Sequence, residues 1–346
     1  MLTAGFHNAL RTDHLDPDAL PTDTKLNVLV DLVHDSLGRP LQVPVLVARG
    51  KRPGPVLGLT AALHGNELNG IPVIHRLFEQ LDCKVLRGTV VAVAAMNVPG
   101  LMLHQRAFDD GSDLNHLFPG RPNGNSSQVY AYRLVERIVS RFTRLIDLHT
   151  ASFGRANSLY VRANMRDDVT ANMAYALRPE IIVHNPPSDR TLRGTAAELG
   201  IPAITVEIGD PQRFQPHYIR STLVGVRSCL ADMGMLPKRA VAPGPDPILC
   251  SRSHWLYTDH GGLLEVLPQV TDRVVQGEVI AQLRDIFGGL VREFHAPEDG
   301  VIVGRSVNPV GPTGARIAHL GIVARPDDAL IGPATGGDSE DEGGEP

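Results

Sequence analysis

The sequence predicts an α/β fold, with a mixed, mostly parallel sheet flanked by helices and a small all-β domain after it. Continuous apolar runs in the first part are typical of strands buried on both faces. Segments with helical spacing alternate with these runs, as in parallel-sheet proteins. From residue 248 to 323, short Val-, Ile- and Leu-rich runs lie between Gly and Pro turns, with no helical period.

The elements of the first half follow from these patterns in order. Residues 1–24 have no periodicity and predict an N-terminal arm. Two apolar runs around a Gly-Pro turn then predict a hairpin, at residues 28–33 and 41–48. Continuous apolar runs predict buried strands at residues 55–63, 89–95 and 144–148. Apolar residues three and four apart predict helices at residues 68–81 and 126–142.

Predicted strands and helices continue to alternate as far as residue 233, and a segment without helical spacing follows. Strands are predicted at residues 158–161, 180–183 and 203–208, and helices at residues 169–177, 191–199 and 218–233. The Pro- and Gly-rich residues 242–247 then predict a linker. We therefore divide the chain into an arm (1–24), an α/β domain (25–240), an all-β domain (248–325) and a disordered acidic tail (332–346).

Composition excludes several classes of protein. The net charge is −5, but residues 338–346 hold five acids, and without them 33 acidic residues face 33 basic ones. A chain without excess positive charge is not expected to bind nucleic acid or an anionic membrane through its overall charge. The sequence has no apolar run near the roughly 20 residues of a membrane span and no signal-peptide pattern at its start. Three scattered cysteines predict neither a disulfide framework nor a thiolate zinc site. We expect a cytoplasmic protein.

Chemistry-bearing side chains follow three of the predicted strands. His64 and Glu67 come after the first buried strand, Asp147 and His149 end another, and Glu207 ends a third. Open α/β proteins build their sites at the carboxyl ends of strands. Two histidines and one carboxylate suit a catalytic zinc with an open position, and a further glutamate suits a general base. The residues alone therefore favour a metal hydrolase, although His64 could also be a solvated turn histidine.

A long polar loop follows the second buried strand and begins at Arg106. This arginine could stabilise a developing oxyanion, or it could form only a surface salt bridge. The sequence has no G-x-S-x-G elbow, phosphate-binding loop or G-x-G-x-x-G turn, which disfavours serine hydrolases, nucleotide hydrolases and dinucleotide oxidoreductases.

The order H-x-x-E, R…D-L-N-x-x-F-P-G, D-x-H-T and T-V-E-I-G resembles the succinylglutamate desuccinylase/aspartoacylase family, a branch of the zinc carboxypeptidase superfamily. The likeness covers residues 55–235 and implies a zinc-carboxypeptidase-like fold with one zinc per chain. The roles that it implies are zinc ligation by His64, Glu67 and His149, general base catalysis by Glu207, carbonyl polarisation by Arg106 and substrate binding by Asn115. Asp113 matches an aspartate that orients a ligand histidine, and we assign Asp147 to a similar supporting position.

One position departs from the family pattern. The family usually has an arginine after the motif asparagine, where it clamps a substrate carboxylate, and this sequence has His116. We therefore weigh two alternatives for substrate binding: the substrate lacks that carboxylate, or Arg121 reaches back to replace the clamp. An acidic amino-acid substrate is in doubt on this ground.

The C-terminal segment 261–320 resembles the barrel-sandwich domain of biotinyl and lipoyl carriers. Carriers need an exposed lysine, and the last lysine of the chain is Lys238. A carrier is therefore excluded, and a lid, a wall of the site or an oligomer contact remains.

The sequence thus predicts an enzyme, a zinc-dependent deacylase that cleaves the amide of an N-acyl amino acid or a similar small amide. A metallocarboxypeptidase or an esterase on the same site is the alternative within enzymes. A non-catalytic metal- or ligand-binding protein is the alternative outside them, and Glu207 disfavours it, because a binding protein does not need a general base. The expected partner is a small acylated molecule. The sequence also allows a homo-oligomer but does not predict one.

Overall fold

The computed structural model describes residues 8–187, 190–238 and 245–332. The start of the predicted arm, part of the predicted linker and the predicted tail beyond Gly332 lie outside the described residues. Within the described residues no helix is both long enough and apolar enough to span a bilayer.

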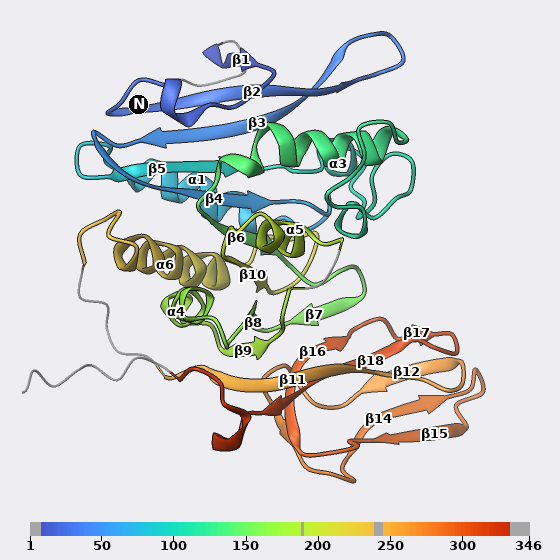
Figure 1. The fold of residues 1–346 in the computed structure, drawn as a ribbon. Helices are drawn as coiled ribbons and strands as arrows, with labels where there is room; N and C mark the ends of the chain where they lie inside the picture. The colour runs from blue at the N-terminus through green and yellow to red at the C-terminus, as the bar shows by residue number, and fades with distance from the viewer. Residues whose placement is uncertain (1–7, 188–189, 239–244, 333–346) are drawn as a thin grey trace, which may run out of the picture.

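As far as residue 232, α-helices separate groups of one to four strands (Figure 1). The helices are α1 (Gly70–Gln80), α2 (Val98–Met102), α3 (Ser126–Arg137), α4 (Asp168–Leu177), α5 (Leu192–Glu198) and α6 (Pro216–Asp232). The strands up to that point are β1 (Leu10–Thr12), β2 (Thr24–His34), β3 (Pro40–Arg49), β4 (Arg52–Ala61), β5 (Arg87–Val93), β6 (Arg144–His149), β7 (Arg155–Asn157), β8 (Leu159–Ala163), β9 (Ile181–His184) and β10 (Ala203–Ile208).

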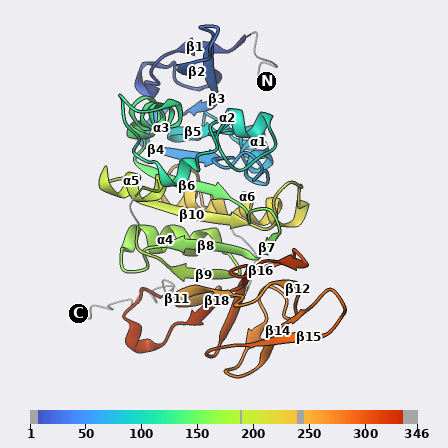
Figure 2. The same cartoon turned by 90° about the vertical axis from the view of Figure 1, so that its right-hand side faces the viewer.

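The C-terminal segment is built from strands and one short 3₁₀ turn, Pro326–Asp328. Its strands are β11 (Ile248–Tyr257), β12 (Gly262–Val266), β13 (Arg273–Val274), β14 (Val279–Arg284), β15 (Leu290–His295), β16 (Gly300–Ser306), β17 (Val310–Gly311) and β18 (Arg316–Val323). They divide between two sheets. Strands β15-β14-β12-β17 form a small sheet, which both views place beyond β9, at the opposite end of the molecule from β1 (Figures 1 and 2).

The large sheet has the order β1-β2-β3-β5-β4-β6-β10-β8-β9-β11-β18-β16-β13, with β7 paired to β16. At its centre β5, β4, β6 and β10 run parallel to one another. Helices α1, α4 and α6 contribute to one apolar cluster on the sheet, and α3 and α5 contribute to another. The predicted α/β fold is confirmed, and the central strands are mostly apolar because helices cover both faces.

Helix α3 is shorter than the sequence predicts. A capping box between Asn125 and Gln128 precedes its first residue, Ser126, which is the predicted start. It ends at Arg137, because Ile138 leaves helical geometry and residues Val139–Arg141 form a 3₁₀ turn. The apolar period continues through that turn, so periodicity alone extends the predicted helix to residue 142.

The C-terminal strands continue the large sheet at two places. Strand β11 adds to the edge of β9 in parallel, with Ile248 opposite Ile181. Strand β16 pairs with β7, with Arg305 opposite Ala156. The boundaries of the domains remain our prediction, but these pairings place strands from beyond residue 248 directly beside the α/β core.

The register of the central strands aligns the residues at their carboxyl ends. Thr60 of β4 and Thr205 of β10 both lie opposite Asp147 of β6, and Glu207 lies opposite His149. After β4, the loop that contains His64 packs against α2 so closely that a Cβ on Gly65 would lie 2.0 Å from the Gly100 backbone. The chain therefore turns sharply at this edge and brings the loop over the strand ends.

Candidate active site

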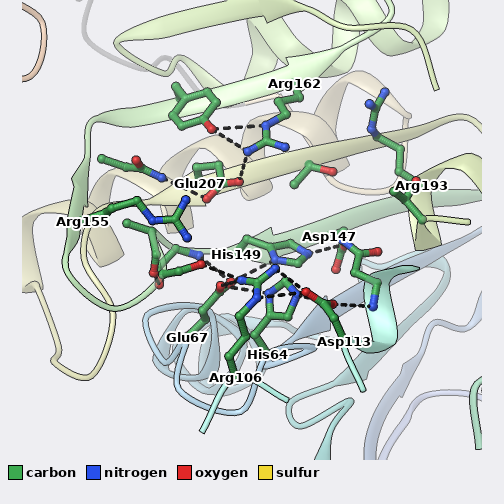
Figure 3. Close-up of a pocket in the computed structure, with 18 of the residues that line it drawn as sticks. His64, Glu67, Arg106, Asp113, Asp147, His149, Arg155, Arg162, Arg193 and Glu207 are labelled. Atoms are coloured by element: carbon green, nitrogen blue, oxygen red, sulfur yellow. Dashed lines mark hydrogen bonds and ion pairs between the residues drawn. The ribbon is translucent and has the colours of Figure 1, made fainter. Parts of the chain in front are cut away.

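Three buried side chains meet at the carboxyl edge of the sheet (Figure 3). His64 and Glu67 come from the loop after β4, and His149 is the last residue of β6. Their exposed fractions are 3%, 2% and 4%. One ligand atom from each lies within 4.8 Å of the others, so the three could hold one metal ion. The structure thus brings together the residues that the sequence predicts as ligands.

The two imidazoles are oriented in the same way. The Nδ1 atoms of His64 and His149 each lie 2.9 Å from an oxygen of Glu67. Their Nε2 atoms face outward, 3.1 Å from Asp113 and 2.8 Å from Asp147. An outer carboxylate on the far nitrogen is the usual support for a metal-binding histidine. Asp113 and Asp147 therefore lie where the sequence predicts supporting residues.

The donor set fits a divalent cation on two observations. The buried Nδ1 of His64 is close to Glu67 but lacks hydrogen-bond geometry, so it has no hydrogen-bond partner. A buried polar atom without a partner is costly unless something else binds it. In addition, three carboxylates, Glu67, Asp113 and Asp147, surround the cluster, and Arg106 is the fixed cation that pairs with two of them. Two histidines and one carboxylate are the ligand types that zinc takes.

The pKa shifts within the cluster also fit a site for a divalent cation. Burial raises the pKa of Glu67, but the charge of His64 and the hydrogen bond to His149 outweigh it and hold that pKa far below its usual range. Burial lowers the pKa of His149, but the carboxylates of Asp147 and Glu67 raise it well above the usual value. The carboxylates therefore stabilise a positive charge at this point. A bound metal ion would supply that charge in place of a proton.

Arg106 joins the cluster from the loop after α2. Its Nη1 donates to Glu67 at 3.0 Å and to the Ser152 hydroxyl at 2.6 Å. Its Nε and Nη2 both donate to Asp113, at 3.0 Å and 2.8 Å. The side chain is 36% exposed, so the guanidinium is fixed by two carboxylates and still borders the open cavity.

Glu207 is the second-to-last residue of β10 and is also buried. Arg162 donates to its Oε1 at 2.7 Å, and the Asn157 side chain donates to its Oε2 at 3.2 Å. Arg162 also donates to the Tyr160 hydroxyl at 2.7 Å. The carboxylate is therefore held in one orientation at the edge of the cavity that His149 also lines. Arg162 was not predicted from the sequence, although an arginine within the mostly apolar strand β8 was a usable signal.

All these side chains line one cavity of about 460 Å³. Among the predicted substrate residues, Asn115 and His116 line it, whereas Arg121 is exposed and is not among its lining residues. The Asn115 Oδ1 accepts a hydrogen bond from the Leu192 backbone at 2.9 Å, so this amide also anchors the start of α5.

Other lining residues that sequence reasoning missed include Arg155, Arg193, Trp255 and Arg316. Trp255 is the only tryptophan of the chain, which was a weak signal. The arginines gave no signal, because nothing in their local pattern separates them from surface arginines.

The geometry agrees with comparisons to known proteins. A sequence model described as the succinylglutamate desuccinylase/aspartoacylase catalytic domain matches residues 53–233. The N-alpha-acetyl-L-2,4-diaminobutyric acid deacetylase of Halomonas elongata is 27% identical over 298 residues, covering 81% of this chain and 86% of the relative. A succinylglutamate desuccinylase of Pseudomonas paraeruginosa is 29% identical over 189 residues, covering 50% of this chain and 56% of the relative.

Solved structures show the same fold. The product-bound ectoine utilization protein EutE of Ruegeria pomeroyi superposes with a TM-score of 0.79 at 20% identity, covering 88% of this chain and 98% of that one. A succinylglutamate desuccinylase/aspartoacylase of Rhodobacter sphaeroides superposes with a TM-score of 0.78 at 22% identity, covering 90% and 98%. Because the family model covers more than half of the chain and the predicted motifs meet in one cavity, this protein belongs to the succinylglutamate desuccinylase/aspartoacylase family of amidohydrolases.

Proposed function

We propose that this protein is a zinc-dependent deacylase that cleaves the amide of an N-acyl amino acid or a similar small acylated amine. The observation that carries the proposal is the buried Nδ1 of His64, which has no hydrogen-bond partner and lies in a group of three side chains that could hold one metal ion. His64, Glu67 and His149 would hold the ion. Zinc bound there would supply a Lewis acid for the carbonyl and would lower the pKa of water.

The chain's own residues would perform the remaining steps. Glu207 takes a proton from the attacking water as the new C–O bond forms, and later gives that proton to the amine nitrogen as the C–N bond breaks. Arg106 borders the cavity and is fixed by Glu67, Ser152 and Asp113. Its positive charge and the remaining N–H on Nη2 can therefore stabilise charge on the carbonyl oxygen without reorganisation. The products are a carboxylate and a free amine, and one water is consumed.

The names of the relatives support a small acylated amino acid. One relative is named for removing an acetyl group and another for removing a succinyl group, in each case from an amino acid. The cavity of about 460 Å³ is of a size for such molecules. A carboxypeptidase or an esterase on the same site is the competing activity, because the same residues would attack a peptide or an ester carbonyl.

A hydrolysis screen with zinc-loaded protein tests the proposal. N-acetyl and N-succinyl amino acids, dipeptides and matched esters would be compared, before and after chelation and after zinc is restored. We expect N-acyl amino acids to be cleaved fastest, and the activity to vanish with the chelator and return with zinc. Faster cleavage of dipeptides or esters would favour the competing activity. Activity that survives complete metal removal would contradict the proposal.

A substitution at His116 tests how the substrate is held. The His116 side chain is 73% exposed at the rim of the cavity, with its Nε2 3.8 Å from Asp113. An arginine there would offer two parallel hydrogen bonds to a carboxylate, and one charge-assisted bond is worth about 1.5–3 kcal/mol. We expect His116→Arg to raise kcat/KM for N-acyl amino acids with a free carboxylate at least about tenfold, relative to their carboxamides.

The control for this prediction is His116→Lys, which adds a charge without the planar fork. It should improve the same ratio less than the arginine does. If the ratio is the same in wild type, His116→Arg and His116→Lys, His116 does not face the carboxylate of the substrate.

A further inference from the structure

Two helices that pack against each other, α1 and α6, begin at side-chain amides that do not cap them. Asn69 is the N-cap residue of α1, and Gln215 is the N-cap residue of α6. An asparagine at this position usually accepts a hydrogen bond from the first turn of its own helix. Neither amide does so here. Both are buried, with exposed fractions of 0% and 7%, so each needs partners elsewhere in the fold.

The two residues bond to each other instead. The Asn69 Nδ2 donates to the Gln215 Oε1 at 3.0 Å, and the Gln215 backbone N–H donates to the Asn69 Oδ1 at 2.9 Å. The Asn69 Nδ2 also donates to the Ile208 carbonyl at 2.7 Å. The Gln215 Oε1 accepts a second bond, from the Asp210 backbone at 2.7 Å. The pair therefore joins two helix starts and the loop after β10 into one buried network.

This network lies between the two segments that carry Glu67 and Glu207. Asn69 is two residues after Glu67, in the loop that leads from β4 to α1. Its partner Ile208 directly follows Glu207 and is the last residue of β10. The bond from Asn69 to Ile208 therefore links the proposed metal-binding loop to the strand end that presents the proposed general base.

Backbone bonds join the strand-end loops at two further points. The Gln212 N–H donates to the Asn66 carbonyl at 2.9 Å, and the Ala151 N–H donates to the Gly209 carbonyl at 2.8 Å. Gly209 has a φ of +66°, and a Cβ there would lie 2.3 Å from the Gln215 Oε1. Glycine at this position lets the Gln215 amide approach the backbone of the loop.

The amide pair does not touch the substrate cavity. Glu67 and Glu207 line that cavity, whereas Asn69 and Gln215 are not among its lining residues. A change in the pair would therefore remove no contact to the substrate. It would instead free the end of β10 to move relative to the loop of Glu67.

We propose that Asn69 and Gln215 are positioning residues, which fix the place of Glu207 relative to the loop that carries Glu67. The inference deepens the proposed function and rests on it. A general base must lie within hydrogen-bond reach of the proton that it takes. A misplacement of about 1 Å that arises far from the reacting atoms can lower the rate about a hundredfold.

A double-mutant cycle on kcat tests this role. Asn69→Ala is expected to lower kcat about 30- to 100-fold and to leave KM within about threefold of wild type, because it displaces Glu207 and removes no substrate contact. In a Glu207→Gln background, the same substitution should lower kcat less than about threefold, because the side chain that it positions no longer takes the proton. A merely structural role would lower the active fraction equally in both backgrounds, and that result would overturn the proposal.

Gln215→Ala is the second variant, in case Asn69→Ala does not fold. It removes the side-chain amide but keeps the backbone N–H that donates to Asn69. We expect kcat to fall about tenfold, and this loss should again disappear in the Glu207→Gln background. An unchanged kcat in Gln215→Ala would contradict the positioning role.

Asn125→Ala is the control. Asn125 is also a helix N-cap residue, but its Oδ1 accepts from the Gln128 backbone in the first turn of its own helix, α3. It is not among the residues that line the cavity. The substitution removes the same side-chain amide and should lower the Tm without changing kcat in either background. A loss of kcat as large as that of Asn69→Ala would show that the effect is not specific to the pair.

Hydrogen exchange gives a readout that does not depend on activity. The Asp210 backbone N–H donates to the Gln215 Oε1, so its exchange reports whether the pair holds the loop. In zinc-loaded protein, we expect residues 205–214 to exchange at least about tenfold faster in Gln215→Ala and at the wild-type rate in Asn125→Ala. Unchanged exchange in Gln215→Ala would overturn the proposal. If no acylated amino acid is cleaved at all, the proposed function fails, and this measurement still decides whether the pair holds the end of β10.

Discussion

Glu207→Gln is expected to lower kcat by roughly 10³-fold, because general acid–base catalysis contributes about 10²–10⁴-fold and an amide cannot take the proton of water. The substitution keeps the size and shape of the side chain. Asn157 and Arg162 now donate to different oxygens of the carboxylate, and the single oxygen of the amide can accept from only one of them. Single-turnover and steady-state rates on the best substrate of the screen would measure the effect.

Two further measurements separate catalysis from folding in this variant. Removing the charge of Glu207 leaves Arg162 without its carboxylate, and because Arg162 is 39% exposed the cost lies below the roughly 3–5 kcal/mol of a fully buried ion pair. The melting temperature should therefore fall, but zinc content at the assay temperature should equal that of wild type. The control is Glu265→Gln, an exposed glutamate on β12, which should change neither quantity. A Glu207→Gln enzyme with more than a tenth of wild-type kcat would rule out the general base role.

His149→Ala is expected to abolish zinc binding and activity together. His149 offers its Nδ1 to the proposed metal position and is held by Asp147 on its far side. The loss of one of three ligands removes a bond that the remaining two cannot replace. Metal analysis of purified protein should find one zinc ion per chain in wild type and none in the variant.

Thermal unfolding gives a second readout that does not depend on activity. A ligand that binds only the folded state stabilises it by about 3 kcal/mol when its free concentration is about one hundred times Kd. Added zinc should therefore raise the Tm of chelator-treated wild type and of His75→Ala, which removes an exposed histidine of α1. The Tm of His149→Ala should not respond. Full zinc occupancy in His149→Ala would mean that the ligand set is wrong.

The central strands were predictable because a continuous apolar run in the local sequence indicates that a strand is buried on both faces. The predicted strand at residues 203–208 matches β10, Ala203–Ile208, since both faces of that strand are covered by helices. The short strands β1, β7, β13 and β17 were not predicted. Strands of two or three residues carry no detectable period. This omission matters for the site, because β7 carries Arg155.

The cluster of His64, Glu67 and His149, with Glu207 nearby, was determined by the sequence alone, because the carboxyl ends of parallel strands meet at one edge of a sheet. The arginines that line the cavity could not be predicted from the sequence in this way. Arg155, Trp255 and Arg316 reach the cavity only because β16 pairs with β7 and β11 pairs with β9. The period of a strand reports which face is buried, but it does not report which distant strand lies beside it. The tertiary structure alone therefore decided which of these charges line the cavity.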